Sequence, residues 1–490
     1  MLVSQALARA QARRPAAIPL EFPVQSNPGR HGADGETRLI NCYMENIGKE
    51  GKTPYPIYAA DGFSLFSTLT GGGGTRGMIS TETLLFVVSG RLLFAVDSTG
   101  TIQTIGGVPD EGPVFFSKNR ANPQQIVLTT TNGLKYVITN TSPTPTIAEI
   151  TDTDLPSPNS NDFIDGYTLY GIRDGRVFFS AIDDAATIDA LDYFEAEGSP
   201  DKLKRVFVHK RTIFLLGDDT TELWDSVGDA TNPFQRSPGG YAQFGLMATA
   251  SVASLGENVV LIDSHGRVVE VNASGAVRRI STYAVERSID DLSLSDKALI
   301  EGFVHHHRGH EIYVLSGSGF TWAYDLTTGL WHERVSQGET RWRAAYHAFF
   351  AGKHILGDFE SAYLYEESED SYDENDAEMI ATIRFPIHAW PDAIALNRLR
   401  VDMIPGVGLN SADLHLSDPQ LMMRLSRNGG KSYGNSYSRS IGKIGEYTAS
   451  TEFSKCGSSN EDGFVVELSV SAAVIRGFTG LSGDIRKIRR

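Results

Sequence analysis

Cysteine is nearly absent from this chain, which has only Cys42 and Cys456 among its 490 residues. Two cysteines cannot build a disulfide framework, and this pair lacks the spacing of a zinc site. The sequence is therefore unlike the small secreted folds that disulfides hold together. The low cysteine content is compatible with a reducing cytoplasm.

Long hydrophobic runs are also missing. Apolar runs such as Leu84–Val88 and Val259–Ile262 are far shorter than the roughly 20 residues that a membrane-spanning helix needs. Near the N-terminus the arginines follow the apolar residues, which is the reverse of a secretory signal. We expect no membrane insertion.

Positively charged residues are fewer than negatively charged ones. The chain has 44 Lys and Arg residues against 60 Asp and Glu residues, so its formal net charge is −16. Proteins that bind DNA by neutralising its phosphates need the opposite balance, which argues against specific nucleic-acid binding. An acidic channel wall would still let a duplex slide past, so non-specific proximity to double-stranded DNA stays compatible with the sequence.

Helical patterns are few, and the longest candidates are Leu2–Arg14 and Ser293–Leu299. Glycine is abundant instead, with 49 residues, and aromatic residues make up 10% of the chain. Thr, Ser, Val and Ile fill short runs between turn-forming residues, which is typical of strands and turns. The composition predicts a mainly β fold.

Strand-like segments recur at a regular interval through the middle of the chain. Their centres lie 41 to 53 residues apart, at Phe86, Val127, Leu169, Phe214, Val260, Tyr313 and Ile355. A four-stranded blade of a β-propeller needs about 40 to 50 residues. The interval predicts a β-propeller of about seven blades, although an antiparallel sandwich with regular hairpins would give similar spacing.

Hairpins are visible within several of these segments. Leu84–Gly100, Val259–Gly275 and Glu311–Glu333 each consist of an apolar strand, a turn and a second apolar strand. Ser-Gly and His-Gly dipeptides supply the turns. This local pattern favours antiparallel sheets.

The two ends of the chain differ from its middle. We expect an N-terminal extension at 1–17, a segment rich in Pro and Gly at 18–62, the propeller at 63–365, an acidic connecting loop at 366–379 and a β-rich domain at 380–490. The segment 18–62 has too few hydrophobic residues to fold alone. We therefore expect it to add strands to the C-terminal domain, so that both ends form one smaller platform domain.

The segment Ser426–Tyr433 resembles an Asp-box, with Asn428 and Tyr433 in place of the usual Asp and Trp. In this pattern a polar side chain bonds its own turn, a glycine adopts positive φ and the aromatic residue closes the hairpin. Although the box also occurs in sialidases, a single copy indicates a folding device.

Enzymatic chemistry has little support in the sequence. A glycosidase needs two carboxylates on opposite sides of a sugar-binding cleft. The adjacent pairs Asp183 and Asp184, and Asp218 and Asp219, lie in turn-like contexts and are expected to be solvated turns. No catalytic residue is predicted.

The sequence contains one weak candidate for a metal site, a group of histidines. His305 and His307 could lie on one face of a strand and bind a transition metal together with His310. No Cys and no suitably spaced carboxylate joins them, so the pattern favours a polar strand end with surface histidines.

A glycine-rich run, Gly71–Gly74, is followed by Thr75, Arg76 and Gly77. The run lacks the Lys-Ser/Thr ending of a phosphate-binding loop, and no long helix follows it. We expect a flexible lead into the first blade. The sequence thus predicts no cofactor, and neither a cofactor-binding nor a metal-binding residue.

Local positive charge occurs only near the two ends, at Arg9, Arg13 and Arg14 and in Arg486–Arg490. These clusters could dock an acidic partner or touch phosphate. Solvated chain ends are the favoured interpretation.

Three long segments together resemble the packaged-DNA stabilisation proteins of short-tailed bacteriophages, which are tail hub or nozzle proteins. They are Thr221–Gly245, Gly309–Arg334 and Leu421–Tyr447, and the segment Arg38–Asn46 fits as well. The resemblance runs from about Ile18 to the C-terminus.

This resemblance implies a non-enzymatic structural protein with a β-propeller and a platform built from both chain ends. It implies a homohexameric ring in the virion tail, assembled in the host bacterial cytoplasm and placed below the adaptor ring on the portal. The ring would help to seal the filled head, and tail spikes or fibres and a needle or plug would attach to it. Residues 1–17 and the acidic loop 366–378 depart from what the family implies.

Two other function classes stay open from the sequence. A propeller that binds or degrades glycans on the host surface would have an aromatic-lined pocket with carboxylates or arginines at its mouth. A scaffold in a cellular complex would form no ring and would not depend on phage partners.

Overall fold

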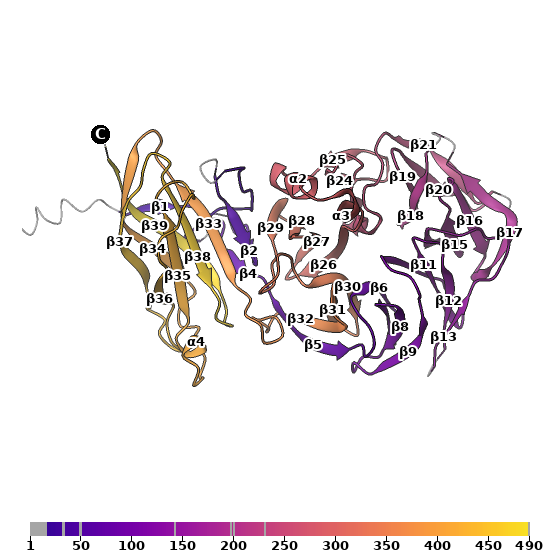
Figure 1. Cartoon of the computed structure of the whole chain (residues 1–490), viewed down its shortest axis with the longest axis horizontal. Helices are drawn as coiled ribbons and strands as arrows, with labels where there is room; N and C mark the ends of the chain where they lie inside the picture. The colour runs from indigo at the N-terminus through magenta and orange to yellow at the C-terminus, as the bar shows by residue number, and fades with distance from the viewer. Residues whose placement is uncertain are drawn as a thin grey trace, which may run out of the picture. The chain divides into compact units, whose positions relative to one another are not determined.

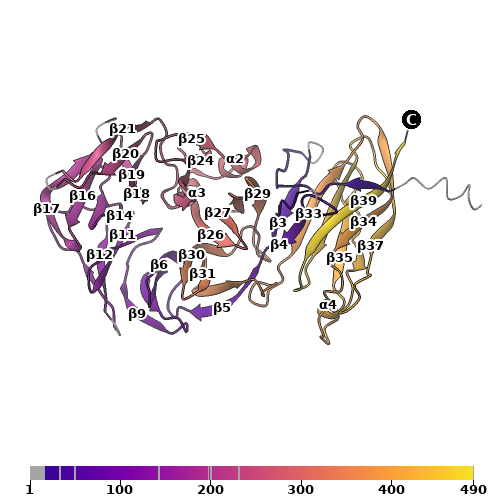
Figure 2. The ribbon, with the colours of Figure 1, turned by 180° about the vertical axis from the view of Figure 1, so that it is seen from behind.

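The computed structural model describes residues 17–31, 35–48, 51–141, 144–196, 198, 201–229 and 232–488. The chain divides into two compact units. We call one the platform, which comprises Met1–Gly62, Leu330–Gln337 and Glu369–Arg490, and the other the propeller, which comprises Phe63–Gly329 and Gly338–Ser368. Strands dominate both units (Figures 1 and 2).

Within the described residues, helix is confined to α2 (Tyr283–Asp290), α3 (Leu294–Ala298), α4 (Leu414–Ser417) and the 3-10 turn Thr249–Ser251. The helix α3 lies where the sequence predicted one, and the Ser293 hydroxyl caps it by accepting a hydrogen bond from the Asp296 backbone N–H. The other predicted helix, at Leu2–Arg14, lies outside the described residues. None of the described helices is long and apolar enough to cross a membrane.

The propeller contains seven antiparallel blades among the described residues, of which six are separate four-stranded sheets and one is a group of three strands. The first four are β6 (Thr75–Ser80) to β9 (Ile102–Gly107), β10 (Val114–Lys118) to β13 (Thr146–Glu149), β14 (Ser160–Ile164) to β17 (Asp184–Glu195) and β18 (Leu203–His209) to β21 (Phe234–Ala242). The strands between these bounds are β7 (Leu85–Ser89), β8 (Leu92–Val96), β11 (Gln124–Thr130), β12 (Lys135–Asn140), β15 (Tyr167–Gly171), β16 (Arg176–Ala181), β19 (Thr212–Gly217) and β20 (Thr221–Ser226).

The remaining three sheets complete the set of blades. The fifth comprises β22 (Ala253–Leu255), β23 (Asn258–Ile262), β24 (Val268–Val271) and β25 (Val277–Arg279). The sixth has β26 (Glu301–His307), β27 (His310–Gly317) and β28 (Phe320–Asp325), and the seventh has β30 (Ala344–Phe350), β31 (Lys353–Asp358), β32 (Tyr363–Ser368) and β5 (Gly62–Thr68). The seven predicted strand centres each lie on the second strand of one sheet, on β7, β11, β15, β19, β23, β27 and β31.

Hydrophobic clusters join neighbouring blades. Phe86 of the first sheet packs with Ile126 of the second, and Phe214 of the fourth packs with Leu261 of the fifth. One cluster contains Leu85 of the first sheet and Ile355 of the seventh, so the circle of blades closes. The predicted propeller is confirmed, and the alternative of a single sandwich is wrong for this part of the chain.

The last blade is completed by a strand from the beginning of the unit. The order β30-β31-β32-β5 places Gly62–Thr68 beside Tyr363–Ser368, almost 300 residues later in the chain. The strand β32 includes Glu366, Glu367 and Ser368, the first residues of the expected acidic loop.

Two sheets build the platform. One has the order β3-β4-β39-β34-β37 with β1 paired to β39, and the other contains β2-β33-β38-β35-β36. Their bounds are β1 (Ile18–Leu20), β2 (Arg38–Ile40), β3 (Cys42–Met44), β4 (Ile57–Ala59), β33 (Ala381–Ile387), β34 (Ala393–Met403), β35 (Gln420–Ser426), β36 (Tyr437–Ser440), β37 (Thr451–Ser458), β38 (Phe464–Val470) and β39 (Gly477–Ile488). The short strand β29 (Leu330–Glu333) pairs in parallel with β2.

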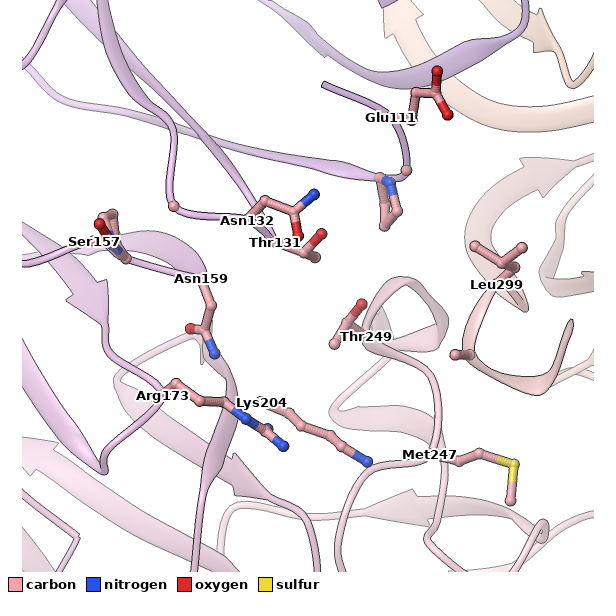
Figure 3. A pocket seen from close by; sticks show the side chains of 15 residues that line it. Glu111, Thr131, Asn132, Ser157, Asn159, Arg173, Lys204, Met247, Thr249 and Leu299 are labelled. Carbon is pink, nitrogen blue, oxygen red and sulfur yellow. The ribbon is translucent and has the colours of Figure 1, made fainter. Parts of the chain in front are cut away.

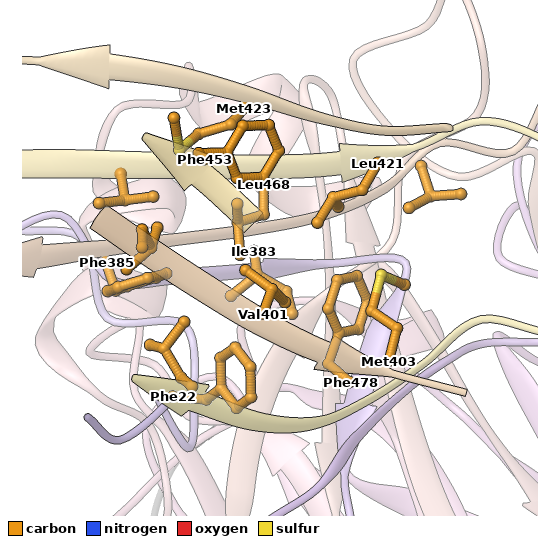
Figure 4. Packing of buried hydrophobic residues seen from close by; sticks show 14 of the residues in the cluster. Phe22, Ile383, Phe385, Val401, Met403, Leu421, Met423, Phe453, Leu468 and Phe478 are labelled. Carbon is orange, nitrogen blue, oxygen red and sulfur yellow. The ribbon is translucent and has the colours of Figure 1, made fainter. Parts of the chain in front are cut away.

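Strands from both ends of the chain pair with each other in these sheets. Leu39 of β2 pairs with Ile383 of β33, and Ile18 of β1 pairs with Gly483 of β39. The expectation that the N-terminal segment adds strands to the C-terminal domain is thus confirmed. One hydrophobic core lies between the sheets (Figure 4), where the ring of Phe22 makes edge contacts with Phe385 and Phe478 at centroid distances of 6.4 and 6.1 Å.

Candidate functional site at the propeller mouth

A pocket of about 670 Å³ opens at one end of the propeller, where turns of successive blades meet (Figure 3). The loops β9–β10 and β13–β14 line it together with the turns β11–β12 and β15–β16. Lys204 of β18, the residues Met247 and Thr249 before β22, and the end of α3 complete the wall. Ligand pockets occupy such loop-lined positions because the strands hold the loops rigidly around them.

The charged groups of the pocket come from different blades. The Arg173 guanidinium donates two hydrogen bonds to the Asp218 carboxylate, at 3.0 and 2.8 Å. The Lys204 ammonium donates to the Leu246 carbonyl at 2.6 Å and lies 3.2 Å from the same carboxylate. Figure 3 shows the Arg173 and Lys204 side chains side by side along one wall. Asp218 therefore neutralises part of the positive charge at the mouth.

The remaining lining combines polar residues with small and aliphatic ones. Its fifteen residues include Glu111, Asn132, Ser157 and Asn159 but no aromatic side chain. The glycan-binding alternative predicted an aromatic-lined pocket at the propeller mouth, and the lining of this pocket differs from that expectation. Glu111 is the one carboxylate of the lining, whereas common glycoside hydrolysis needs two.

The adjacent aspartates lie in or beside turns, and both pairs make specific contacts. Asp183 adopts a positive φ of 54° in the turn between β16 and β17, and the Asp184 carboxylate accepts from the Thr187 hydroxyl. Asp218, however, is not a merely solvated turn residue, because it bridges Arg173 and Lys204. No local signal in the sequence indicates these contacts, since the three residues belong to separate turns and strands.

The expectation of surface histidines is wrong for three residues. His305, His307 and His310 are 2%, 8% and 7% exposed. Within β26 the alternation of side chains turns His305 and His307 inward, and the neighbouring blade covers them. The His305 Nδ1 lies 3.2 Å from Glu367 Oε2. No group of three or more potential ligands with metal-binding geometry occurs in the described part of the chain.

The Asp-box interpretation is confirmed as a folding device. The Ser426 hydroxyl accepts a hydrogen bond from the Gly430 N–H at 2.8 Å, and the Asn428 side chain accepts one from the Ser432 N–H at 3.0 Å. Gly430 has a φ of 88°. The Tyr433 ring lies under the guanidinium of Arg384, 5.5 Å away, and closes the hairpin.

The glycine run leads into the first blade, and tight packing requires glycine at two of its positions. A Cβ atom on Gly74 would lie 2.1 Å from the Phe359 carbonyl oxygen, and one on Gly72 would lie 2.4 Å from Ser89 Oγ. Both distances are shorter than van der Waals contact, so only glycine fits.

The basic clusters at the chain ends are only partly described. Arg9, Arg13 and Arg14 lie outside the described residues, and so do Arg489 and Arg490. Among the described residues of the C-terminal cluster, Lys487 forms an ion pair. Its Nζ lies 3.2 Å from Oδ2 of Asp392 within the platform.

Comparison with known proteins gives one family. The model of the family described as Bacteriophage P22 Gp10, β-propeller, matches residues 51–372. No curated protein matches the chain.

Two solved structures are similar to part of this chain. The WD40 β-propeller domain of Doa1 is 11% identical, with a TM-score of 0.42, and the match covers 63% of this chain and 97% of that one. The computationally designed Ika8 protein is 13% identical, with a TM-score of 0.36, covering 62% of this chain and all of that one. The segment Leu421–Tyr447, which also carried the resemblance to phage proteins, lies beyond the residues that the family model matches.

Proposed function

Because the chain belongs to the family of the bacteriophage P22 Gp10 β-propeller, it is a phage structural protein, and we propose that it is the tail hub, or nozzle, of a short-tailed phage. The match across residues 51–372 is the observation that carries this proposal. In this role the protein acts mechanically, and we assign it no enzymatic activity.

We propose that six copies close a ring below the portal adaptor and extend the DNA channel. Cyclic symmetry repeats each contact, so that modest interfaces together give one durable closure. Two properties of the chain support the role. The closed circle of blades is a rigid wall element, and a net charge of −16 disfavours adhesion of DNA to the wall.

The partners follow from the same proposal. The platform is the part that we assign to the adaptor ring, and the tail spikes or fibres and the needle or plug attach around the hub. The protein then resides in the virion tail after assembly in the host cytoplasm. The packaged genome is retained because its exit is blocked.

The test is DNA retention by particles that lack only this protein. Heads should package DNA normally and then lose it, and supplying the purified protein should restore retention. Heads that stay full while the particles fail to adsorb would instead indicate a receptor-binding or glycan-degrading role and would overturn the proposal.

A second measurement addresses assembly directly. Purified protein mixed with adaptor rings should form a larger complex, with six copies per ring by mass measurement. Titration with host surface polysaccharide should show neither binding nor cleavage. A complex that forms with cellular proteins alone would favour the scaffold alternative.

A further inference from the structure

Two neighbouring loops of the platform carry exposed apolar side chains. The loop after β34 includes Leu409 and leads into α4 with Leu414, and the loop between β36 and β37 includes Ile444 and Tyr447. These four residues are 46%, 78%, 65% and 74% exposed, in the same order. Large apolar groups that gather on a surface commonly mark an interaction site. We call the four residues the loop patch.

The two loops are held against each other. The Gly408 N–H donates to the Gly442 carbonyl at 3.2 Å. A Cβ atom on Gly408 would lie 3.1 Å from the backbone nitrogen of Ile444, and one on Gly406 would lie 3.0 Å from the Tyr447 ring. The loop patch is therefore one surface, although its residues come from two separate parts of the chain.

The charge around the loop patch is negative. Residues 404–419 and 441–450 contain three carboxylates against one cation, if His415 is counted as neutral. The carboxylates are Asp413, Asp418 and Glu446, and the cation is Lys443. An apolar surface in acidic surroundings is complementary to a segment that is both apolar and basic.

The segment 1–16 of this chain has that composition. It contains Arg9, Arg13 and Arg14 and no acidic residue. Its larger apolar residues and two of its alanines recur at a spacing typical of one helix face, at Leu2, Val3, Ala6, Leu7 and Ala10. The segment lies outside the described residues and outside the residues 51–372 that the family model matches.

The direction of β1 favours the loop patch of another copy. Ile18 pairs with Gly483 in an antiparallel ladder, so the N-terminal end of β1 points along β39 toward Ile488. The loop patch follows Met403, at the far end of β34. Figures 1 and 2 draw α4 and the C-terminus at opposite ends of the platform. The chain thus enters β1 from the side opposite to its own loop patch.

We propose that the segment 1–16 of one copy binds the loop patch of a neighbouring copy, with its apolar residues on Leu414 and Tyr447 and its arginines beside Asp413 and Glu446. The inference rests on the proposed ring, which brings the copies together. Because the segment and the loop patch are different surfaces, the contact is head-to-tail, and each copy holds the next around the ring.

Cross-linking between full-length chains tests the contact. Cys42 and Cys456 are buried, so introduced cysteines react preferentially with a short bismaleimide. Leu7→Cys chains mixed with Leu414→Cys chains should give cross-linked dimers, because binding raises the local concentration of the two thiols. With Leu191→Cys chains, whose altered residue is 83% exposed on β17, the yield should be at least about tenfold lower.

Two outcomes of this experiment would overturn the contact. Equal yields with Leu414→Cys and Leu191→Cys chains would show that the loop patch has no preference for the segment. A link within single chains that carry both Leu7→Cys and Leu414→Cys, without dimers from the mixture, would show that the segment binds its own copy.

Mass measurements separate this contact from the hub. Leu414→Asp should raise the protein concentration needed for half-maximal ring assembly at least about tenfold, whereas Leu191→Asp should leave it unchanged. Both residues are exposed, so the fold should persist. Undiminished assembly of Leu414→Asp would overturn the contact and leave the hub standing. Cross-linked dimers from a protein that does not bind adaptor rings would support the contact and overturn the hub.

Discussion

The Nε2 atom of His347 lies 3.0 Å from the Nδ1 atom of His354. One ring can donate to the other only while at least one of the facing nitrogens carries no proton. His305 lies beside the pair, with its ring centroid 5.7 Å from that of His347, and Glu367 is the carboxylate that faces the group. The sixth and seventh blades therefore bring three histidine side chains and one carboxylate together.

Acid should destabilise the propeller through His347. Burial, with smaller effects from His305 and His354, lowers the pKa of His347 to about 3. The unfolded chain therefore takes up this proton first, near pH 6.5, and the stabilisation present above that pH is lost as the pH falls toward 3. We expect a slope of up to about 1.4 kcal/mol per pH unit from this residue.

Denaturant unfolding between pH 4 and pH 8 measures that slope. His347→Gln cannot take up the proton, so its stability should depend less on pH than that of the unaltered chain. His265→Gln, at an exposed position, should keep the original dependence. Identical slopes in all three proteins would contradict the assignment.

Gly74→Ala should strain the junction between the last and first blades. The added methyl would meet the Phe359 carbonyl oxygen, and such overpacking typically costs about 1 to 3 kcal/mol. Gly107→Ala is the control, because no atom lies within 4 Å of the position of its Cβ. Thermal unfolding of both variants should separate them, and an equally stable Gly74→Ala would show that the loop can relax.

Phe22→Ala should weaken the docking of the N-terminal segment in the platform. Phe22 is 4% exposed and contacts two other rings, and truncating a buried phenylalanine costs about 3 to 5 kcal/mol. Limited proteolysis should then cleave near residues 18–40 sooner. Trp390→Ala removes a larger side chain that is 77% exposed, and it should leave the cleavage rate unchanged.

Ser426→Ala should loosen the Asp-box hairpin. The buried hydroxyl accepts from Gly430 and donates to Asn428, so its removal leaves the turn N–H unsatisfied at a cost of about 1 to 3 kcal/mol. Ser438→Ala changes an exposed strand residue and should cost little. Hydrogen exchange at the Gly430 amide provides the measurement, and unaltered protection would argue against a structural role for the box.

The sequence predicted the blades well because burial repeats with each of them. Val127 and Val260 sit at the centre of second strands that are buried except at their first residues, and such strands are the most hydrophobic segments of a blade. The pairing of Gly62–Thr68 with Tyr363–Ser368 could not be foreseen, since short strands carry no information about distant partners.

The candidate sites were harder to predict than the fold. Arg173, Lys204 and Asp218 are ordinary charged residues in the sequence, and only the circular arrangement of blades brings them together. His305 was misjudged because the alternation along β26 does not reveal that another blade covers its inward face.

The last blade is completed only when a late strand joins an early one, and this affects the chain during its synthesis. At about 5 to 20 residues per second, the ribosome releases β5 roughly 15 to 60 s before β32. During that interval the nascent propeller is an open arc, and apolar residues such as Leu69 and Leu85 await the seventh blade that will cover them. A chain that stalls or is truncated before Ser368 therefore leaves these apolar residues open to chaperones and proteases.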